Sequence, residues 1–295
     1  MSANGLPRGI DHIVHAVRDL DAAAALYRSL GFTVGGRNVH PREWGTQNRI
    51  VQTPDTFIEL LSVADESGIV PHGPHYFSFG AFNRDFLARG EGLSMLVLKG
   101  RGAPDAEEFR AKGIGDFELY DFEREGRRPD GSPLKFSFSL AFAADPNAPD
   151  TGFFTCQHRH PPGNFWNAEF QKHANGTTGV AGVVLVADEP ARHRAFMEAF
   201  TDGQAASAQD GLSIATPRGA IEMVTPAAFT RRFGVAAPDT TRGARLAAIR
   251  FTVADAGLLQ DLPELAGIAG LYEGNAAVIG AEDAMGAVIV FESGR

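Results

Sequence analysis

The first clear pattern in the chain is an apolar strand followed by a helix. Residues 10–17 are rich in β-branched side chains and predict a strand, and residues 20–30 predict a helix that ends at a glycine. Two histidines, His12 and His15, lie within the strand. Because side chains alternate along a strand, one of the two imidazoles must face whatever the sheet encloses.

The same pattern occurs three more times, which indicates that one supersecondary unit has been copied along the chain. The later copies begin at Gly92, Val180 and Arg245. After the strand and the helix come short extended stretches separated by turns, which in the first copy cover residues 32–34, 46–52 and 56–63. The repeating unit is therefore strand, helix, strand, strand, strand.

The length of 295 residues exceeds that of one average domain, so we expect two lobes. A polar, turn-rich passage over residues 161–179 lies between the second and third copies and suits a lobe boundary. The first lobe is expected over residues 1–175, with units at 8–65 and 92–165. The second lobe is expected over residues 176–295.

Composition and charge narrow the classes of function. The formal net charge is −9 and the chain has no basic run, so no nucleic-acid partner is expected. It has no apolar run of ~18 residues and no signal-peptide pattern, so we expect a cytoplasmic protein that does not bind a membrane. One cysteine, Cys156, excludes an internal disulfide and fits a reducing compartment. The expected partner is a small-molecule substrate.

Several stretches of the chain together resemble one known family. These are DHIVHAVRDLDAAAALYRSLGF at 11–32, FIELLSV at 57–63, QHRHPPGNFW at 157–166 and HANGTTGV at 173–180. With the four units, they are similar to a glyoxalase-like protein of the vicinal oxygen chelate (glyoxalase/bleomycin resistance/dioxygenase) superfamily. The resemblance implies an α+β fold in which four βαβββ units pair into two lobes with curled mixed sheets. It also implies a divalent metal held inside a cup.

The resemblance points to two metal ligands in the first unit. The family's first-strand ligand lies seven residues before the aspartate that opens the helix, which here makes it His12 before Asp19, and its last-strand glutamate matches Glu59. The residues themselves agree, because a buried carboxylate in an apolar strand needs a cation, a donor or a proton. We therefore expect His12 and Glu59 to act in catalysis and to bind one divalent metal, Zn, Fe, Mn or Ni. A lone strand histidine is otherwise typical of a core residue.

The second unit departs from the family's pattern. Met95 stands at the position that matches His12, and the closing strand at 153–160 has no glutamate. Alternation divides this strand into two faces, Cys156, His158 and His160 on one and Thr155, Gln157 and Arg159 on the other. If the first face lines the cup, His158 is the third metal ligand. If the second does, Gln157 and Arg159 bind substrate and no metal is expected.

Further residues are candidates for substrate binding. The segment 38–49 brings His40, Trp44 and Asn48 close together, and a similar WGTxN passage lies at the rim of the pocket in glyoxalase-like relatives. An ordinary hairpin is the equal alternative. Phe138 belongs to a strand with phenylalanine at alternate positions, which either packs as core or receives an aromatic or alkyl substrate.

Three arginines near a turn, Arg124, Arg127 and Arg128, are candidates to clamp a carboxylate, although such a charge run is more typical of a solvated loop. In the second lobe the positions that match His12 are Ala181 and Ala248, which cannot bind a metal. Glu222 matches Glu59 without a partner histidine and is expected in an ion pair. The second lobe then serves as support or as a dimer surface, so a homodimer is one expected assembly.

The function favoured by these residues is that of a metal-assisted lyase or isomerase acting on a small oxygenated molecule, aromatic if the phenylalanines face the cup. A metal would act as a Lewis acid on two adjacent oxygens, and Glu59 would move a proton. With iron, the same ligand set would favour an extradiol-type ring-cleaving dioxygenase. A metal-free small-molecule binding or sequestration protein is the alternative that Met95 favours. No Gly-rich phosphate loop, Gly-x-Ser-x-Gly or HExxH pattern is present.

Overall fold

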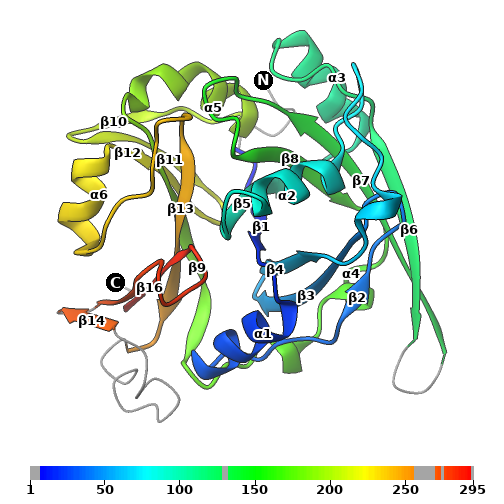
Figure 1. Ribbon diagram of the computed structural model, residues 1–295, viewed down its shortest axis with the longest axis horizontal. Coiled ribbons are helices and arrows are strands. Elements are labelled where there is room, and N and C mark those ends of the chain that lie inside the picture. The colour runs from blue at the N-terminus through cyan, green and yellow to red at the C-terminus, as the bar shows by residue number, and fades with distance from the viewer. Residues whose placement is uncertain (1–6, 128–131, 256–269, 274–275, 294–295) are drawn as a thin grey trace.

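The computed structural model describes residues 7–127, 132–255, 270–273 and 276–293 (Figure 1). For Arg127 and for residues 270–273 it describes the backbone alone. Its strands form two eight-stranded sheets. The first sheet contains β1 (Ile10–Ala16), β2 (Asn38–Val39), β3 (Thr46–Thr53), β4 (Thr56–Val63), β5 (Gly92–Lys99), β6 (Tyr120–Arg127), β7 (Pro133–Ala143) and β8 (Gly152–His158). The second contains β9 (Thr177–Val186), β10 (Ala206–Ala208), β11 (Gly211–Thr216), β12 (Gly219–Val224), β13 (Arg245–Val253), β14 (Gly270–Glu273), β15 (Ala276–Ile279) and β16 (Val288–Ser293).

Short helices connect these strands. The α-helices are α1 (Leu20–Ser29), α2 (Phe79–Leu87), α3 (Ala103–Ala111), α4 (Pro162–Phe165), α5 (Arg194–Thr201) and α6 (Pro226–Phe233). The 3-10 helices are η1 (Glu66–Gly68), η2 (Ala168–Gln171) and η3 (Pro190–His193). The turn at Pro129 and the side chains of Arg127 and Arg128 lie outside the described residues.

The strand order shows how the units pair. It is β2-β3-β4-β1-β5-β8-β7-β6 in the first sheet and β10-β11-β12-β9-β13-β16-β15-β14 in the second. In both, the first strands of two units lie antiparallel at the centre, and each pairs in parallel with the last strand of its own unit. The predicted α+β fold with paired units and two curled mixed sheets is confirmed.

The opening strand and helix form for local reasons that the sequence contains. β1 is fully buried, and Asp19 caps α1 by accepting hydrogen bonds from the backbone N–H groups of Asp21 and Ala22. The helix ends before Gly31, whose φ of +81° is in the left-handed region. A Cβ at Gly31 would lie 2.8 Å from the Asn175 side chain, so glycine also allows the segment that joins the two lobes to pass close to α1.

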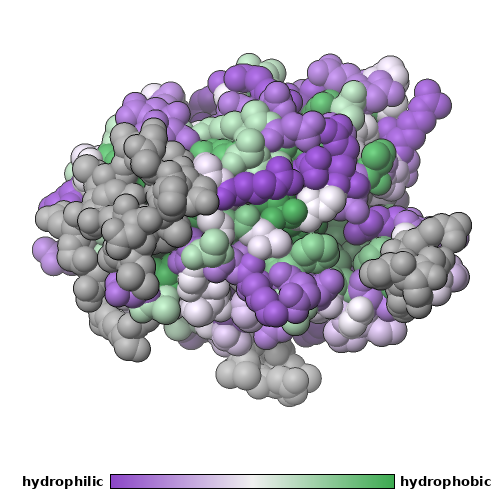
Figure 2. All heavy atoms as spheres, turned by 90° about the horizontal axis from the view of Figure 1, so that it is seen from below, coloured by the Kyte–Doolittle hydropathy of each residue, from purple (hydrophilic) through white to green (hydrophobic). Residues whose placement is uncertain are grey.

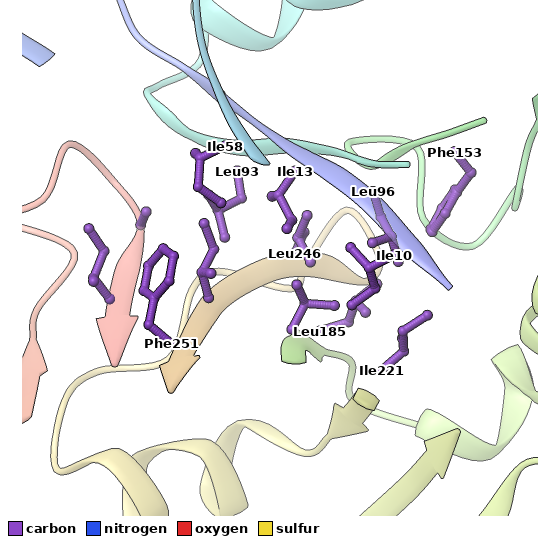
Figure 3. Close-up of a cluster of buried hydrophobic side chains, with 14 of the residues drawn as sticks. Ile10, Ile13, Ile58, Leu93, Leu96, Phe153, Leu185, Ile221, Leu246 and Phe251 are labelled. Atoms are coloured by element: carbon purple, nitrogen blue, oxygen red, sulfur yellow. The ribbon is translucent and has the colours of Figure 1, made fainter. Parts of the chain in front are cut away.

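One large apolar core is shared by both sheets. Figure 3 shows Ile13 of β1 and Leu93 of β5 on one side of this core, with Leu185 of β9 and Leu246 of β13 on the other. Side chains on the opposite face of the first sheet form a separate cluster of mostly aromatic residues. The first sheet therefore has one face in the core between the lobes and one face free to enclose a site.

The edges of the first sheet meet through side chains. The Tyr120 hydroxyl on β6 donates to Glu43 Oε1 at 2.7 Å, and Arg124 Nη1 on the same strand donates to Asn38 Oδ1 at 3.0 Å. Both acceptors belong to the segment of β2 and the turn before β3. The curled sheet is thus nearly closed, and the aromatic cluster lies inside it.

In the second lobe no histidine stands at the positions that match His12, as expected. Glu222 forms ion pairs with Arg250 at 2.5 Å and Arg232 at 3.1 Å, so the predicted ion pair is confirmed. The register corrects one assignment, because Glu222 pairs with Val184 and the residue that corresponds to His12 is Gly182 rather than Ala181. The difference of one residue arises because Glu189, not Asp188, precedes the helical turn of this unit.

Exposed apolar side chains on the described surface are scattered. The large ones are Val39 in β2, Val70 after η1 and Phe170 in η2. The face seen in Figure 2 mixes hydrophilic and hydrophobic residues. No helix in the described part of the chain is long and apolar enough to cross a membrane.

Truncating the shared core should destabilise both lobes together. Ile13 is fully buried between the sheets, so Ile13→Ala should lower the free energy of unfolding by about 2 to 5 kcal/mol in a single transition. Val39 is 70% exposed, and Val39→Ala should cost less than about 0.5 kcal/mol. Urea unfolding of the two variants measures the difference. Equal effects would contradict the burial of Ile13, and two separate transitions would contradict a core shared by the sheets.

His15 links stability to pH. It is buried on the core face of β1, 3.0 Å from the Tyr27 hydroxyl and 3.0 Å from the Met285 carbonyl, and burial lowers the pKa of its imidazole. The folded state therefore resists a proton that the unfolded chain takes up below pH ~6.5, so stability should fall as pH decreases from there.

Replacing this imidazole should weaken the pH dependence. His15→Gln should reduce the slope of unfolding free energy against pH between about 6.5 and 5 by up to ~1.4 kcal/mol per pH unit. Denaturant titrations across this range provide the measurement, with His75→Gln at an exposed histidine as the control. An unchanged slope in His15→Gln would show that His15 is protonated equally in both states.

Candidate active site

A bulge in β1 turns two neighbouring polar side chains toward the same cluster. The pairing of β1 with β5 shifts register between Ile10 and His12, so Asp11 is the extra residue. Asp11 Oδ2 lies 2.8 Å from His12 Nδ1, and the His12 ring stacks on Phe57 with 4.3 Å between centroids. Asp11 therefore fixes the orientation of the imidazole and leaves His12 Nε2 to face the hollow.

Glu59 on β4 is the acid that meets His12. Its Oε2 lies 3.7 Å from His12 Nε2, and its Oε1 lies 3.4 Å from His40 Nε2 and accepts a hydrogen bond from Asn48 Nδ2 at 2.6 Å. The residue is only 5% exposed. A buried carboxylate thus has an imidazole nitrogen near each of its oxygens.

His40 is held as a neutral ring. Burial lowers the pKa of its imidazole, with Glu59 acting in the opposite direction. Its Nε2 lies 2.9 Å from Asn48 Nδ2, which can only donate, so Nε2 is an acceptor and Nδ1–H donates to Thr46 Oγ1 at 2.8 Å. The lone pair of His40 Nε2 therefore points toward Asn48 and Glu59.

These polar groups lie at one side of a hollow with aromatic walls. The hollow has a cavity volume of about 50 Å³. Its polar lining includes His12, His40, Asn48 and Glu59. Its apolar lining consists of Trp44, Ile50, Phe57, Phe79, Phe122, Phe138, Leu140, Phe154 and Phe165. Cys156 and Arg124 also line the hollow. Such a lining is typical of a small-molecule site with a few polar groups that orient the ligand.

The second unit contributes apolar residues where the first contributes ligands. Glu59 pairs with Val14, two residues after His12, and Phe154 pairs with Val97, two residues after Met95. Met95 and Phe154 are therefore the counterparts of His12 and Glu59, and both are buried. The polar side of the hollow comes almost entirely from the first unit.

Comparison with known proteins identifies the family of the chain. A family model described as a glyoxalase-like domain matches residues 10–201. The chain belongs to this family. The match spans the whole first sheet and continues into the second, and the predicted resemblance to a glyoxalase-like protein of the vicinal oxygen chelate superfamily is confirmed.

Solved structures match the fold of this glyoxalase-like chain over almost its full length. A hypothetical protein from Staphylococcus aureus aligns with a TM-score of 0.64 and 11% identity, covering 97% of this chain and 99% of the other. A mutant of 4-hydroxymandelate synthase from Streptomyces coelicolor aligns with a TM-score of 0.57 and 11% identity, covering 97% and 92%. No curated protein sequence matches. At these identities the likeness concerns the fold alone.

A second polar group lies beside the hollow. Ligand atoms of Asp11, Cys156 and His158 lie within 4.8 Å of one another and form a possible metal site among the described residues. Asp11 Oδ2 is 3.2 Å from His158 Nε2, and its other oxygen is paired with the Lys99 ammonium.

The donor chemistry of this trio is poor for a divalent ion. Burial acts to raise the pKa of Asp11, but His158 and His12 hold it well below its usual range, so the carboxylate is fully engaged. Burial raises the pKa of the Cys156 thiol well above its usual range, and Asp11 raises it further, so the sulfur keeps its proton. The Lys99 ammonium places a positive charge beside Asp11, and this charge would repel a metal cation bound there.

The donor chemistry around Glu59 is better. Because Asp11 accepts the proton of His12 Nδ1, the other ring nitrogen faces a carboxylate and requires either a proton or a cation between them. His40 offers a second neutral nitrogen on the far side of Glu59. Two imidazoles and one carboxylate are a donor set suited to Zn, Fe, Mn or Ni.

The structure brings most of the sequence-predicted residues together, with two exceptions. His12, His40, Trp44, Asn48, Glu59 and Phe138 all line the hollow. His158 Nε2 lies 3.2 Å from Asp11 Oδ2 and makes no N···O contact within 4.0 Å of Glu59 among the described residues, so its role as the third metal ligand stays a prediction. Gln157 lies on the opposite face of β8, where its side-chain oxygen packs against Gly102.

Asp11 was missed because strict alternation places it on the core face, opposite His12. The bulge overrides that alternation, and its signal in the sequence was a carboxylate within an apolar strand. Phe57 was missed because an aromatic residue beside a predicted ligand looks the same whether it packs as core or stacks on the ligand. The positions of Asp11 and Phe57 both depend on contacts between segments that are distant in the sequence.

Removing the Asp11 charge should destabilise the fold. Asp11→Asn leaves the Lys99 ammonium without its carboxylate and removes the acceptor between two imidazoles, so unfolding free energy should fall by about 2 kcal/mol, less than for a fully buried pair because Lys99 is partly exposed. Asp21→Asn, at an exposed acid paired with Arg37 and Arg49, should change little. Urea unfolding tests both, and an Asp11→Asn variant as stable as the Asp21→Asn control would contradict this role.

Proposed function

We propose that the hollow of the first lobe is a metal-assisted active site of a lyase or isomerase that acts on a small oxygenated molecule with an apolar or aromatic body. The observation that carries this proposal is the position of Glu59. Its two carboxylate oxygens lie 3.7 Å from His12 Nε2 and 3.4 Å from His40 Nε2 inside a hollow whose remaining walls are largely aromatic.

His12 and Glu59 would hold the metal, with His40 as the third donor in place of His158. His40 is favoured because its Nε2 lies 3.4 Å from Glu59 Oε1, whereas His158 Nε2 lies beside Asp11. A metal bound by His40 would replace the hydrogen bond that Asn48 Nδ2 donates to its Nε2. The Asp11 carboxylate behind His12 would raise the basicity of the ligand and keep its ring in place. When bound, a divalent ion supplies Lewis-acid chemistry that stabilises negative charge developing on substrate oxygens.

The chain's own residues divide the remaining work. Asn48 holds Glu59 in place through Oε1, and the Glu59 carboxylate is the group that would accept and return a proton. Phe57 and Phe154 flank the His12 ring, and the aromatic walls exclude water from the polar groups. A low local dielectric strengthens the interaction of these groups with developing charge.

Two other functions are each supported by a specific feature of the hollow. Two imidazoles and a carboxylate with iron would support an extradiol-type ring-cleaving dioxygenase, which oxygen uptake with catechols would reveal. A metal-free binding or sequestration protein is favoured by Met95 and Phe154 at the counterpart positions, which halve the polar groups that two equivalent units would supply.

Metal content separates these possibilities. Protein purified without chelator should contain about one divalent metal per chain by elemental analysis, and His12→Ala, Glu59→Ala and His40→Ala should each reduce that content at least roughly tenfold. His158→Ala and Cys156→Ser should retain the metal. Circular dichroism of each variant confirms that the loss is not unfolding.

Two results would overturn the assignment. Metal lost in His158→Ala and Cys156→Ser but retained in Glu59→Ala would move the ion to the Asp11 trio. Metal absent after loading with Zn²⁺, Fe²⁺, Mn²⁺ and Ni²⁺, in a protein whose hollow still binds small aromatic molecules, would favour the metal-free binding protein.

A further inference from the structure

We propose that the ligand of this hollow is an organic acid and that Arg124 binds its carboxylate. This inference rests on the proposed function for the role of Glu59, but not for the binding itself. It concerns the entrance to the site rather than the groups that would carry out chemistry. The position of Arg124, the absence of a described carboxylate in contact with it and its hydrogen-bonded link to Glu59 each support it.

Arg124 lies where the inner hollow meets a wider outer groove. The outer groove has a volume of about 710 Å³ and is lined in part by α4, Trp166 and Phe170. Three residues line both spaces, Ile50, Arg124 and Phe165. A ligand that reaches Glu59 from the groove must therefore pass the guanidinium, and a ligand longer than the inner hollow must remain beside it.

The described residues place no acid in contact with the guanidinium, and Glu59 interacts with its charge from a longer distance. No carboxylate of the described residues lies within 4.0 Å of Arg124, which donates to Asn38 Oδ1 at 3.0 Å and lies over the Phe136 ring at 4.2 Å. In the second lobe, by contrast, Arg250 is paired with both Glu222 and Glu292. A half-buried arginine without an acid is costly unless a ligand supplies the negative charge.

The linings of the two spaces contain no competing cation. Within the described chain, Arg124 is the one lysine or arginine among the residues that line either the hollow or the groove. One of its five N–H donors is used by Asn38, so a forked pair remains for a carboxylate. In a chain with a net charge of −9, this local positive group is what would admit an anion.

Arg124 is also connected to the acid at the centre of the site. Its Nη1 donates to Asn38 Oδ1, Asn38 Nδ2 donates to Asn48 Oδ1 at 3.0 Å, and Asn48 Nδ2 donates to Glu59 Oε1 at 2.6 Å. This chain of hydrogen bonds fixes the guanidinium relative to Glu59. A carboxylate on Arg124 would therefore orient the rest of the ligand toward His12 and Glu59.

A set of matched acids and amides tests the proposal without any need for turnover. Acetate, benzoate, phenylacetate and 3-phenylpropionate, each with its primary amide, are titrated into the full-length protein, and binding is followed by calorimetry. We expect at least one acid to bind roughly tenfold to a hundredfold more tightly than its amide. Arg124→Gln should remove that preference while leaving affinity for the amide unchanged, and Arg124→Lys should restore part of it.

Arg159→Gln is the matched control, because Arg159 directly follows β8 of the same sheet but does not line either space. It should keep the preference for acids. An equal affinity for acid and amide across the whole series, or a preference that survives Arg124→Gln, would overturn the proposal.

The titrations also separate this inference from the proposed function. They are repeated on protein treated with chelator. A preference for acids that depends on Arg124 in a protein that never holds metal would support this inference and remove the metal-assisted reaction. A protein that holds metal through Glu59 but shows no preference for acids would do the reverse.

Discussion

The site depends on one buried carboxylate. Glu59 is almost completely removed from solvent, and a carboxylate in such a place must be compensated. Asn48 donates one hydrogen bond to Glu59, and one imidazole nitrogen lies near each of the two Glu59 oxygens. Balancing the negative charge of Glu59 also requires a proton or a cation. Most of the remaining lining is aromatic, and the Arg124 guanidinium is its other charged group. The space between Glu59 and His12 is therefore where the proposed function is centred.

The fold creates this situation by duplication and then by loss of symmetry. Pairing two units gives a curled sheet whose outer face packs into a core shared with the second lobe and whose inner face encloses a hollow. In the first sheet one unit supplies His12 and Glu59 and the other supplies Met95 and Phe154. In the second sheet an ion pair of Glu222 and Arg250 occupies the corresponding region. In the first lobe, by contrast, Glu59 and two imidazoles line a hollow.

The sequence predicted what depends on local pattern. The repeats, the cap at Asp19 and the meeting of His12 with Glu59 follow from alternation, helix signals and the family resemblance. It failed where tertiary contacts decide the outcome. The bulge that turns Asp11 inward, the contact that draws His158 to Asp11, and the face of Gln157 all depend on how β1, β5 and β8 align, which no single segment encodes. His40 was expected at the hollow, but its approach to Glu59 required the hairpin to fold over β4.

The central claim is that a cation binds at Glu59 between the imidazoles of His12 and His40. The most direct measurement is anomalous X-ray diffraction from crystals of the full chain grown with Co²⁺, recorded on both sides of the cobalt absorption edge. One strong anomalous peak is expected within bonding distance of Glu59 and His12 Nε2, with His40 Nε2 as a further ligand. A peak bound instead by Asp11, Cys156 and His158, or no peak at either place, would contradict it.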